Sequence, residues 1–296
     1  MIHWRCCRLA LVLLLLLTAG SAVAADPPKV PKGVTAHRNL EYAEVGEQSL
    51  QLDLYVPDDV ENPPLVVWIH GGGWRKGSRV GGGPSFRLCT TGYATATISY
   101  RFTDVAPFPA QIHDCKAAIR FLRANAGKYG YDGERIGVIG HSAGGHLAAL
   151  LGVTGDVKSL EGDVGEFDET SSRVQAVINQ AGPTDFPKRI RRRGEKGAKD
   201  AVFKLLGGKT DPEGEAAKEV SAVTYVSSDD PPILNVFGDT DTVVKAYHGE
   251  TLHRLYQEAD LDSQLVILPD TGHVDSGFFN AENFRRMKAF FDEKLK

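Results

Sequence analysis

The stretch RIGVIGHSAGGHLAALL, from Arg135 to Leu151, places a glycine-framed serine between two apolar runs. The first run predicts a buried β-strand over 135–139, and the second predicts an α-helix over about 143–151. Between them, residues 140–144 read Gly-His-Ser-Ala-Gly and match G-x-S-x-G, a motif that is meaningful between a strand and a helix. Side chains at its two glycine positions would collide with neighbouring backbone, so the tight turn holds the Ser142 hydroxyl above the sheet. We predict that Ser142 is a nucleophile.

Apolar runs on both sides of this stretch predict strands that alternate with helices. Strands are expected at 50–56, 65–69, 93–100, 176–180, 233–237 and 264–268, and helices at 84–91, 112–122, 247–259 and 283–295. This alternation indicates an α/β fold with a mainly parallel central sheet and helices on both faces. The alternating run 50–56 predicts an antiparallel N-terminal edge. The polar region 183–228 predicts an insertion over the sheet, because no second hydrophobic core is visible.

A serine hydroxyl is a weak nucleophile unless a base takes its proton and an acid orients that base. After a turn of this kind, the acid and the histidine follow the serine in that order, each in a loop after a strand. The loop after 233–237 offers Asp239 and Asp241; we favour Asp241 as the acid and Asp239 as a turn former. The loop after 264–268 offers His273, which we predict is the base.

A glycine-rich loop at 70–74, His-Gly-Gly-Gly-Trp, follows an earlier buried strand. The reaction needs two backbone N–H donors for the developing oxyanion; Ala143 is expected to supply one and this loop the other. Glycine suits the loop because no Cβ keeps the backbone from the substrate oxygen. This stretch lacks one residue that a phosphate-binding loop requires and one that a dinucleotide-binding loop requires, so both kinds of loop are excluded. His70 is expected to brace the loop by hydrogen bonds.

Several other residues near these motifs are expected to have structural roles. His248 and His253 fall in a predicted amphipathic helix and are expected at its surface. Phe278 and Phe279 are expected to pack in the core. A second glycine run, 81–83, is expected to form a flexible loop that leads into a helix.

The N-terminus predicts a secretory signal peptide over 1–24, which leaves 25–296 as the catalytic domain. Arg5 and Arg8 precede the apolar run Leu9 to Leu17, and Ala22-Val23-Ala24 forms an A-x-A cleavage site. The apolar run is much shorter than the ~20 residues that span a bilayer, so no membrane span is expected after cleavage. The protein is therefore expected to be secreted or periplasmic.

Charge and cysteine content limit the partners and cofactors. The formal net charge of −4 argues against a nucleic-acid partner. The basic run 188–193 is either a solvated face, which we favour, or an attraction for an acidic substrate such as a uronic-acid-bearing polysaccharide. Cys89 and Cys115 either pair or remain buried thiols, and no Cys/His cluster has the spacing of a metal site.

The motifs at 70–74, 140–146, 238–241 and 272–273 together resemble the α/β-hydrolase esterases. The group with bifunctional feruloyl and acetyl-xylan esterases and related carboxylesterases is the most similar, since hormone-sensitive-lipase-like esterases usually carry Asp where this chain has His141. The resemblance implies an α/β-hydrolase fold with a short cap at about 183–228 and no cofactor. It implies these roles: nucleophile Ser142, general base and acid His273, orienting acid Asp241, and oxyanion donors Ala143 with Gly72 or Gly73.

The expected function is that of an exported serine carboxylic-ester hydrolase, which works through an acyl-serine intermediate. The substrate is expected to be a short-chain or plant-polysaccharide ester, such as acetyl xylan or a feruloyl ester. One alternative is an amidase of the kynurenine-formamidase kind, against which the signal peptide counts. The other is a non-catalytic binding protein with a hydrolase fold, which typically lacks a triad member.

Overall fold

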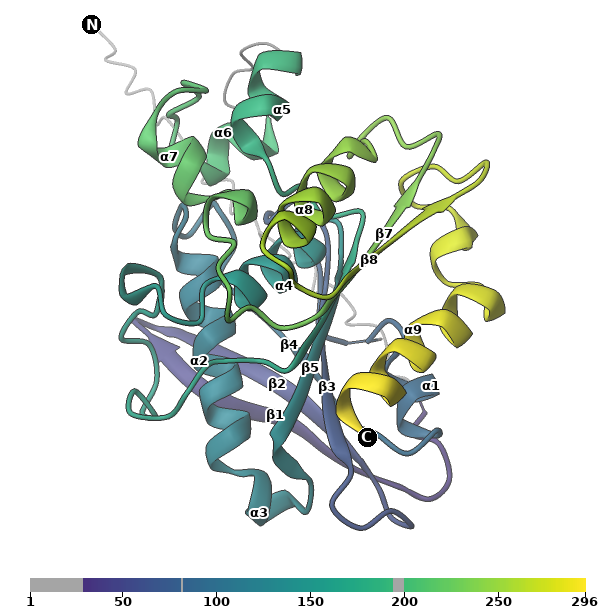
Figure 1. Cartoon of the computed structure of the whole chain (residues 1–296). Helices are drawn as coiled ribbons and strands as arrows, with labels where there is room; N and C mark the ends of the chain where they lie inside the picture. The colour runs from purple at the N-terminus through teal and green to yellow at the C-terminus, as the bar shows by residue number, and fades with distance from the viewer. Residues whose placement is uncertain (1–28, 81, 194–199) are drawn as a thin grey trace, which may run out of the picture.

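The computed structural model describes residues 29–80, 82–193 and 200–296, and the expected signal peptide lies outside them. One eight-stranded sheet with the order β1-β2-β4-β3-β5-β6-β7-β8 runs through the described part (Figure 1). Its strands are β1 (Val34–Val45), β2 (Gln48–Pro57), β3 (Pro64–Ile69), β4 (Ala94–Ile98), β5 (Asp132–His141), β6 (Ala176–Gln180), β7 (Ile233–Gly238) and β8 (Ser263–Leu268). Strands β3 to β8 pair with one another in parallel. Strand β1 pairs with β2, and β2 pairs with β4, in the antiparallel direction.

Helices cover both faces of the sheet, as the alternation of strands and helices predicts (Figure 1). The helices are α1 (Ser85–Cys89), α2 (Ala110–Ala124), α3 (Ala126–Tyr129), α4 (Ala143–Val153), α5 (Phe186–Arg193), α6 (Ala201–Leu205), α7 (Glu215–Glu219), α8 (Tyr247–Glu258) and α9 (Ala281–Leu295). Apolar residues of α2, α4 and α8 share one core cluster, and those of α1 and α9 share a second. The predicted α/β fold is confirmed.

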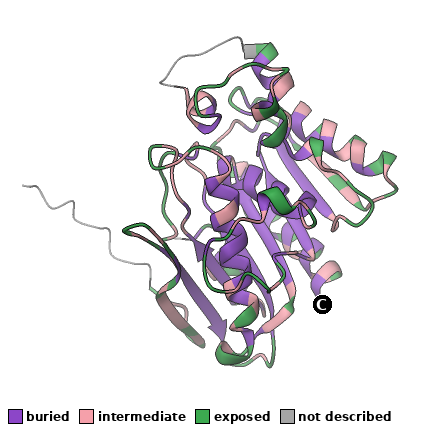
Figure 2. Ribbon diagram, turned by 90° about the vertical axis from the view of Figure 1, so that its left-hand side faces the viewer, coloured by how far each residue is buried: buried purple, intermediate pink, exposed green. Residues whose placement is uncertain are grey.

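The central strands are buried on both sides, and Figure 2 shows them in purple beneath their helices. In β3, Leu65, Val67 and Ile69 join the cluster under α2 and α4, whereas Val66 and Trp68 join the cluster under α9. A continuous apolar run is therefore required here, because both faces of the strand are covered.

The sheet has an edge strand, β1, that the sequence analysis does not predict. Its side chains are mostly half-buried or exposed, and its pairing with β2 is irregular between His37 and Leu40 and between Glu41 and Ala43. Such irregularities break the two-residue alternation by which a half-buried strand is recognised. The antiparallel edge thus has two strands. Strand β2, which was predicted at the edge, is the second strand of the sheet, between β1 and β4.

The insertion at 183–228 forms α5, α6, α7 and a 3-10 turn at Ala222–Thr224. Buried residues of these elements, among them Phe186, Leu205 and Ala217, belong to the same core cluster as α2 and α4. The insertion therefore packs on the body of the fold within the described residues. Pro183 and Val202 line a hollow together with Ser142, so the insertion also borders the serine.

Cys89 and Cys115 are both buried free thiols, which answers the open question of their pairing. Burial raises the pKa of Cys89 to about 12, and burial also raises the pKa of Cys115. Neither thiol is therefore ionised near neutral pH.

Part of the second glycine run, 81–83, is packed: a Cβ on Gly83 would come within 2.5 Å of the Trp68 indole. Among the described helices, none is both long and apolar enough to cross a membrane.

Candidate active site

Ser142 occupies the turn between β5 and α4 with φ 58° and ψ −119°. A positive φ is strained for a residue with a side chain, and the surrounding backbone holds it in place. A Cβ on Gly140 would lie 2.2 Å from the Gly144 carbonyl oxygen, and one on Gly144 would lie 2.0 Å from the Ile69 carbonyl oxygen. Both positions therefore require glycine, because the turn folds back on itself at Gly140 and presses against the end of β3 at Gly144.

The loops after β7 and β8 bring an acid and a histidine to this serine. His273 Nε2 lies 2.8 Å from Ser142 Oγ, and His273 Nδ1 lies 2.7 Å from Asp241 Oδ2. Because the carboxylate accepts a hydrogen bond from Nδ1–H, Nε2 carries the lone pair that accepts a hydrogen bond from the serine hydroxyl. The structure thus brings Ser142, His273 and Asp241 together in one hydrogen-bonded chain.

Asp241 is fixed by more than the histidine. Its Oδ1 accepts hydrogen bonds from the N–H groups of Val243 at 2.7 Å and Val244 at 2.8 Å. Burial acts to raise the pKa of Asp241, but the hydrogen bonds from His273 and from these N–H groups outweigh it and lower the pKa. The carboxyl group is therefore ionised near neutral pH, and its other oxygen, Oδ2, accepts the hydrogen bond from His273 Nδ1–H.

Asp239, the other acid of this loop, does not contact His273 in the described structure. It is exposed, and its Oδ1 accepts a hydrogen bond from the Thr271 N–H at 3.3 Å. This bond ties the loop after β7 to the loop after β8. Asp239 therefore holds the two loops together, whereas Asp241 contacts His273.

The glycine-rich loop lies directly against the serine turn. A Cβ on Gly71 would come within 2.8 Å of the His141 carbonyl oxygen and 3.4 Å of Ser142 Cβ. Gly73 lines the hollow beside Ser142, whereas Gly72 packs on the carbonyl of Lys76. Neither Gly73 nor Ala143 donates its N–H to a protein acceptor in the part of the chain that the structure describes. Of the two glycines that the sequence analysis leaves open, Gly73 is thus the one beside the serine.

His70 braces this loop. Its Nδ1–H donates to the Gly71 carbonyl at 2.8 Å, and its ring stacks on Tyr100 at 4.5 Å. The Tyr100 hydroxyl in turn donates to the His70 carbonyl at 3.0 Å. Burial lowers the pKa of His70, so the imidazole is neutral and takes the hydrogen-bonding role expected of it.

His146 is a supporting residue that the sequence analysis does not single out. Its Nδ1 accepts a hydrogen bond from Trp74 Nε1 at 3.1 Å, and its Nε2–H donates to the Val220 carbonyl at 2.7 Å. It thereby joins the glycine-rich loop, the serine helix and the insertion. Its position four residues after Ser142, one helical turn along the same face, is the sequence signal that could have found it.

Folding stability is expected to fall in acid through His146. Burial lowers its pKa to about 4, against an ordinary value of 6.5. Between these values the unfolded chain binds a proton that the folded chain excludes, so stability is full above pH 6.5 and falls as the pH drops toward 4. The contribution of one such group at pH 5 is about 2 kcal/mol.

In His146→Gln, the fall in Tm between pH 7.5 and pH 5 is expected to be smaller by about 5 °C, although Tm at pH 7.5 is itself lower. Thermal unfolding of both proteins at the two pH values measures this. The same fall in Tm in both proteins would contradict it.

Two predictions for residues around the site, those for Phe279 and His248, are wrong. Phe278 packs in the core as expected, but Phe279 is 44% exposed beside the ring of His141. His248, expected at a helix surface, is fully buried, and its Nδ1 accepts hydrogen bonds from the N–H groups of Thr184 and Asp185. The insertion covers that face of α8, which periodicity alone does not reveal.

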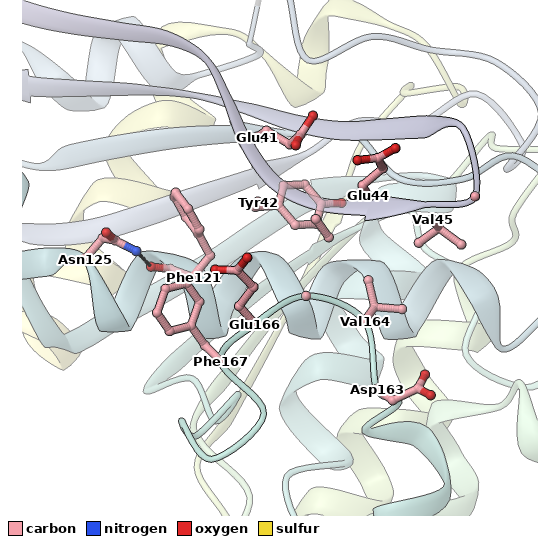
Figure 3. Close-up of a pocket in the computed structure, with 13 residues that line it drawn as sticks. Glu41, Tyr42, Glu44, Val45, Phe121, Asn125, Asp163, Val164, Glu166 and Phe167 are labelled. Carbon is pink, nitrogen blue, oxygen red and sulfur yellow. Dashed lines mark hydrogen bonds between the residues drawn. The ribbon is translucent and has the colours of Figure 1, made fainter.

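Two of the hollows among the described residues differ in character. One of about 210 Å³ opens beside Ser142. Another of about 740 Å³ lies between β1 and the 163–167 loop, and Figure 3 shows four carboxylates around it: Glu41, Glu44, Asp163 and Glu166. No candidate catalytic residue lines the larger hollow, and no described cluster of acidic, histidine and cysteine side chains could hold a metal ion. The smaller hollow is therefore the candidate substrate site.

The sheet, the strained serine turn and the hydrogen-bonded Ser-His-Asp chain define an α/β-hydrolase fold. The chain belongs to the BD-FAE family, whose sequence profile matches residues 52–256.

Known relatives and solved structures agree with this assignment. Esterase LipC of Mycobacterium tuberculosis is 30% identical over 83% of this chain and 64% of its own. The chain thus spans less than two thirds of the length of this relative, and 48% of the probable carboxylic ester hydrolase LipM. A truncated carbohydrate esterase from gut microbiota has a TM-score of 0.84, with 32% identity over 91% of this chain and 99% of its own. A bifunctional GH43-CE protein of Bacteroides eggerthii has a TM-score of 0.82, with 32% identity over 88% of this chain and 35% of its own.

Proposed function

We propose that the protein is a carboxylic ester hydrolase that works through an acyl-serine intermediate. The observation that carries this proposal is the chain of hydrogen bonds from Asp241 through His273 to Ser142, with distances of 2.7 and 2.8 Å. This arrangement supplies an activated nucleophile, a general base and an orienting acid. The esterase relatives add support from outside the site.

Acylation begins when Ser142 Oγ attacks the ester carbonyl carbon and its proton passes to His273 Nε2. Asp241 stabilises the imidazolium that forms, and the N–H groups of Gly73 and Ala143 are the candidate donors to the oxyanion. Each such donor is worth on the order of 3 kcal/mol of transition-state stabilisation. When the tetrahedral intermediate collapses, the bond between the acyl carbon and the alcohol oxygen breaks, and the alcohol leaves with the proton from His273.

Deacylation repeats these steps with water. His273 takes a proton from the water as it attacks the acyl carbon, and the second oxyanion is held by the same donors. The acid is then released as Ser142 Oγ recovers the proton. No cofactor is needed in either half of this reaction.

We infer that the substrate is a short acyl ester on a carbohydrate, such as acetyl xylan, or a feruloyl ester. The hollow beside Ser142, at about 210 Å³, has room for a small acyl group. The similarity to a carbohydrate esterase from gut microbiota supports a sugar as the alcohol. The segment 1–24, with its positive, apolar and A-x-A parts, supports export of the enzyme to the periplasm or beyond.

A substrate panel tests this proposal. Initial rates are measured on p-nitrophenyl acetate, longer aliphatic p-nitrophenyl esters, acetyl xylan, methyl ferulate and N-formyl-kynurenine. We expect hydrolysis of the short esters and of acetyl xylan or methyl ferulate. Failure to hydrolyse any ester would overturn the proposed activity, and a preference for N-formyl-kynurenine would replace it with an amidase.

A further inference from the structure

Another hollow, called the second hollow below, adjoins the one beside Ser142. Its volume is about 190 Å³, and it shares Arg189 and Val243 with the first hollow, so the two meet at these side chains. The remaining residues that line the second hollow are Thr242, Arg192, Lys245 and Tyr247. Among the described residues that line it, Arg189, Arg192 and Lys245 are cationic and none is acidic.

The cations come from two elements that pack together. Arg189 and Arg192 lie on α5, in the basic run of the sequence, and Lys245 lies just before α8. The Arg192 guanidinium stands 4.6 Å above the centre of the Tyr247 ring, and Lys188 stands 4.7 Å from the same ring. These contacts hold the basic face of α5 against the start of α8.

Arg189 fixes the wall between the two hollows. It is only 7% exposed, and its Nη1 donates to the Val243 carbonyl at 3.0 Å. Its charge also contributes to the lowered pKa of His146, so its positive field reaches the helix of Ser142.

Two described carboxylates, Asp200 and Glu213, form other contacts. Asp200 caps α6, where its Oδ1 accepts from the Val202 and Phe203 N–H groups. Glu213 pairs with Arg191 at 2.5 Å. Among the carboxylates that the structure describes, none forms an ion pair with Arg192 or Lys245, and both of these side chains are exposed.

We propose that Arg192 and Lys245 form a subsite for a carboxylate carried by the substrate. The ester bond lies at Ser142, and the carboxylate enters the adjoining hollow. This inference rests on the proposed function and narrows it to esters with an acidic group. The carboxylate belongs either to the acyl half, as in a half-ester of a dicarboxylic acid, or to the alcohol half, as in an acylated uronic acid.

The test compares matched neutral and acidic esters. One pair is p-nitrophenyl butyrate and mono-p-nitrophenyl succinate, which differ in the acyl half; the other is acetylated methyl glucoside and acetylated methyl glucuronide, which differ in the alcohol half. For each pair, the ratio of kcat/KM on the acidic ester to that on the neutral ester is measured. In Arg192→Gln/Lys245→Gln, we expect this ratio to fall about tenfold in one pair, since a hydrogen bond to a charged group is lost.

Arg191→Gln is the matched control, because Arg191 is an exposed cation on the same helix that lines neither hollow. Its ratio is expected to stay at the wild-type value. An unchanged ratio in both pairs for the double variant overturns the subsite, as does an equal fall in Arg191→Gln. A wild type that hydrolyses neither neutral ester overturns the proposed function instead, and the subsite with it.

Discussion

Ser142→Ala is expected to lower kcat on p-nitrophenyl acetate by about 10⁶-fold, because the nucleophile of a triad that acts as a unit is lost. Only the oxyanion donors and substrate binding would remain to accelerate hydrolysis. The measurement is the initial rate at saturating ester, with the same preparation exposed to a fluorophosphonate probe. Wild type is expected to bind the probe covalently, and the variant is expected to remain unlabelled.

The Ser142 variant should fold, since alanine adds no atoms to the turn and the glycines around it are unchanged. Ser159→Ala is the matched control: Ser159 is an exposed serine in the 3-10 turn at Lys158–Leu160, which lines no part of the hollow beside Ser142. Its rate and its labelling are expected to match wild type. Labelling of the Ser142 variant would mean that another residue is the nucleophile.

Features that depend on a short stretch of chain could be predicted from the sequence. The serine turn is an example, because the spacing of Gly140 and Gly144 reflects contacts within a few residues and against one strand end. The order of acid and histidine after the serine was equally accessible, because each follows its own apolar strand. The choice between Asp239 and Asp241 was harder, since both belong to one loop and only the position of His273 separates them.

Features that depend on distant pairing could not be predicted in the same way. His146 accepts from Trp74, 72 residues away, and donates to Val220, 74 residues away, and no local pattern links the three. His248 looks like a surface residue because its helix is amphipathic, but the insertion covers that surface. The edge strand β1 has one neighbour, so it needs little apolar character and leaves a weak signal.

Asp241→Asn is expected to lower kcat by about 10⁴-fold while leaving the fold intact, as replacement of a triad acid by its amide does. The structure gives the reason. Because Oδ1 accepts from the Val243 and Val244 N–H groups, the asparagine must keep its oxygen there and turn its amide nitrogen toward His273. That nitrogen donates to Nδ1, so the ring proton moves to Nε2. His273 then donates to Ser142 Oγ and can no longer take its proton.

Asp239→Asn separates this effect from a general disturbance of the loop. The amide oxygen of an asparagine at 239 can still accept from the Thr271 N–H, so the bond between the two loops is kept. We expect kcat within about fivefold of wild type, since the loss of one exposed charge changes little. The measurement is kcat for both variants at pH 7.5, with Tm as the check on folding. An inactive Asp239 variant beside an active Asp241 variant would contradict the assignment of Asp241 as the acid, which rests on its hydrogen bond with His273.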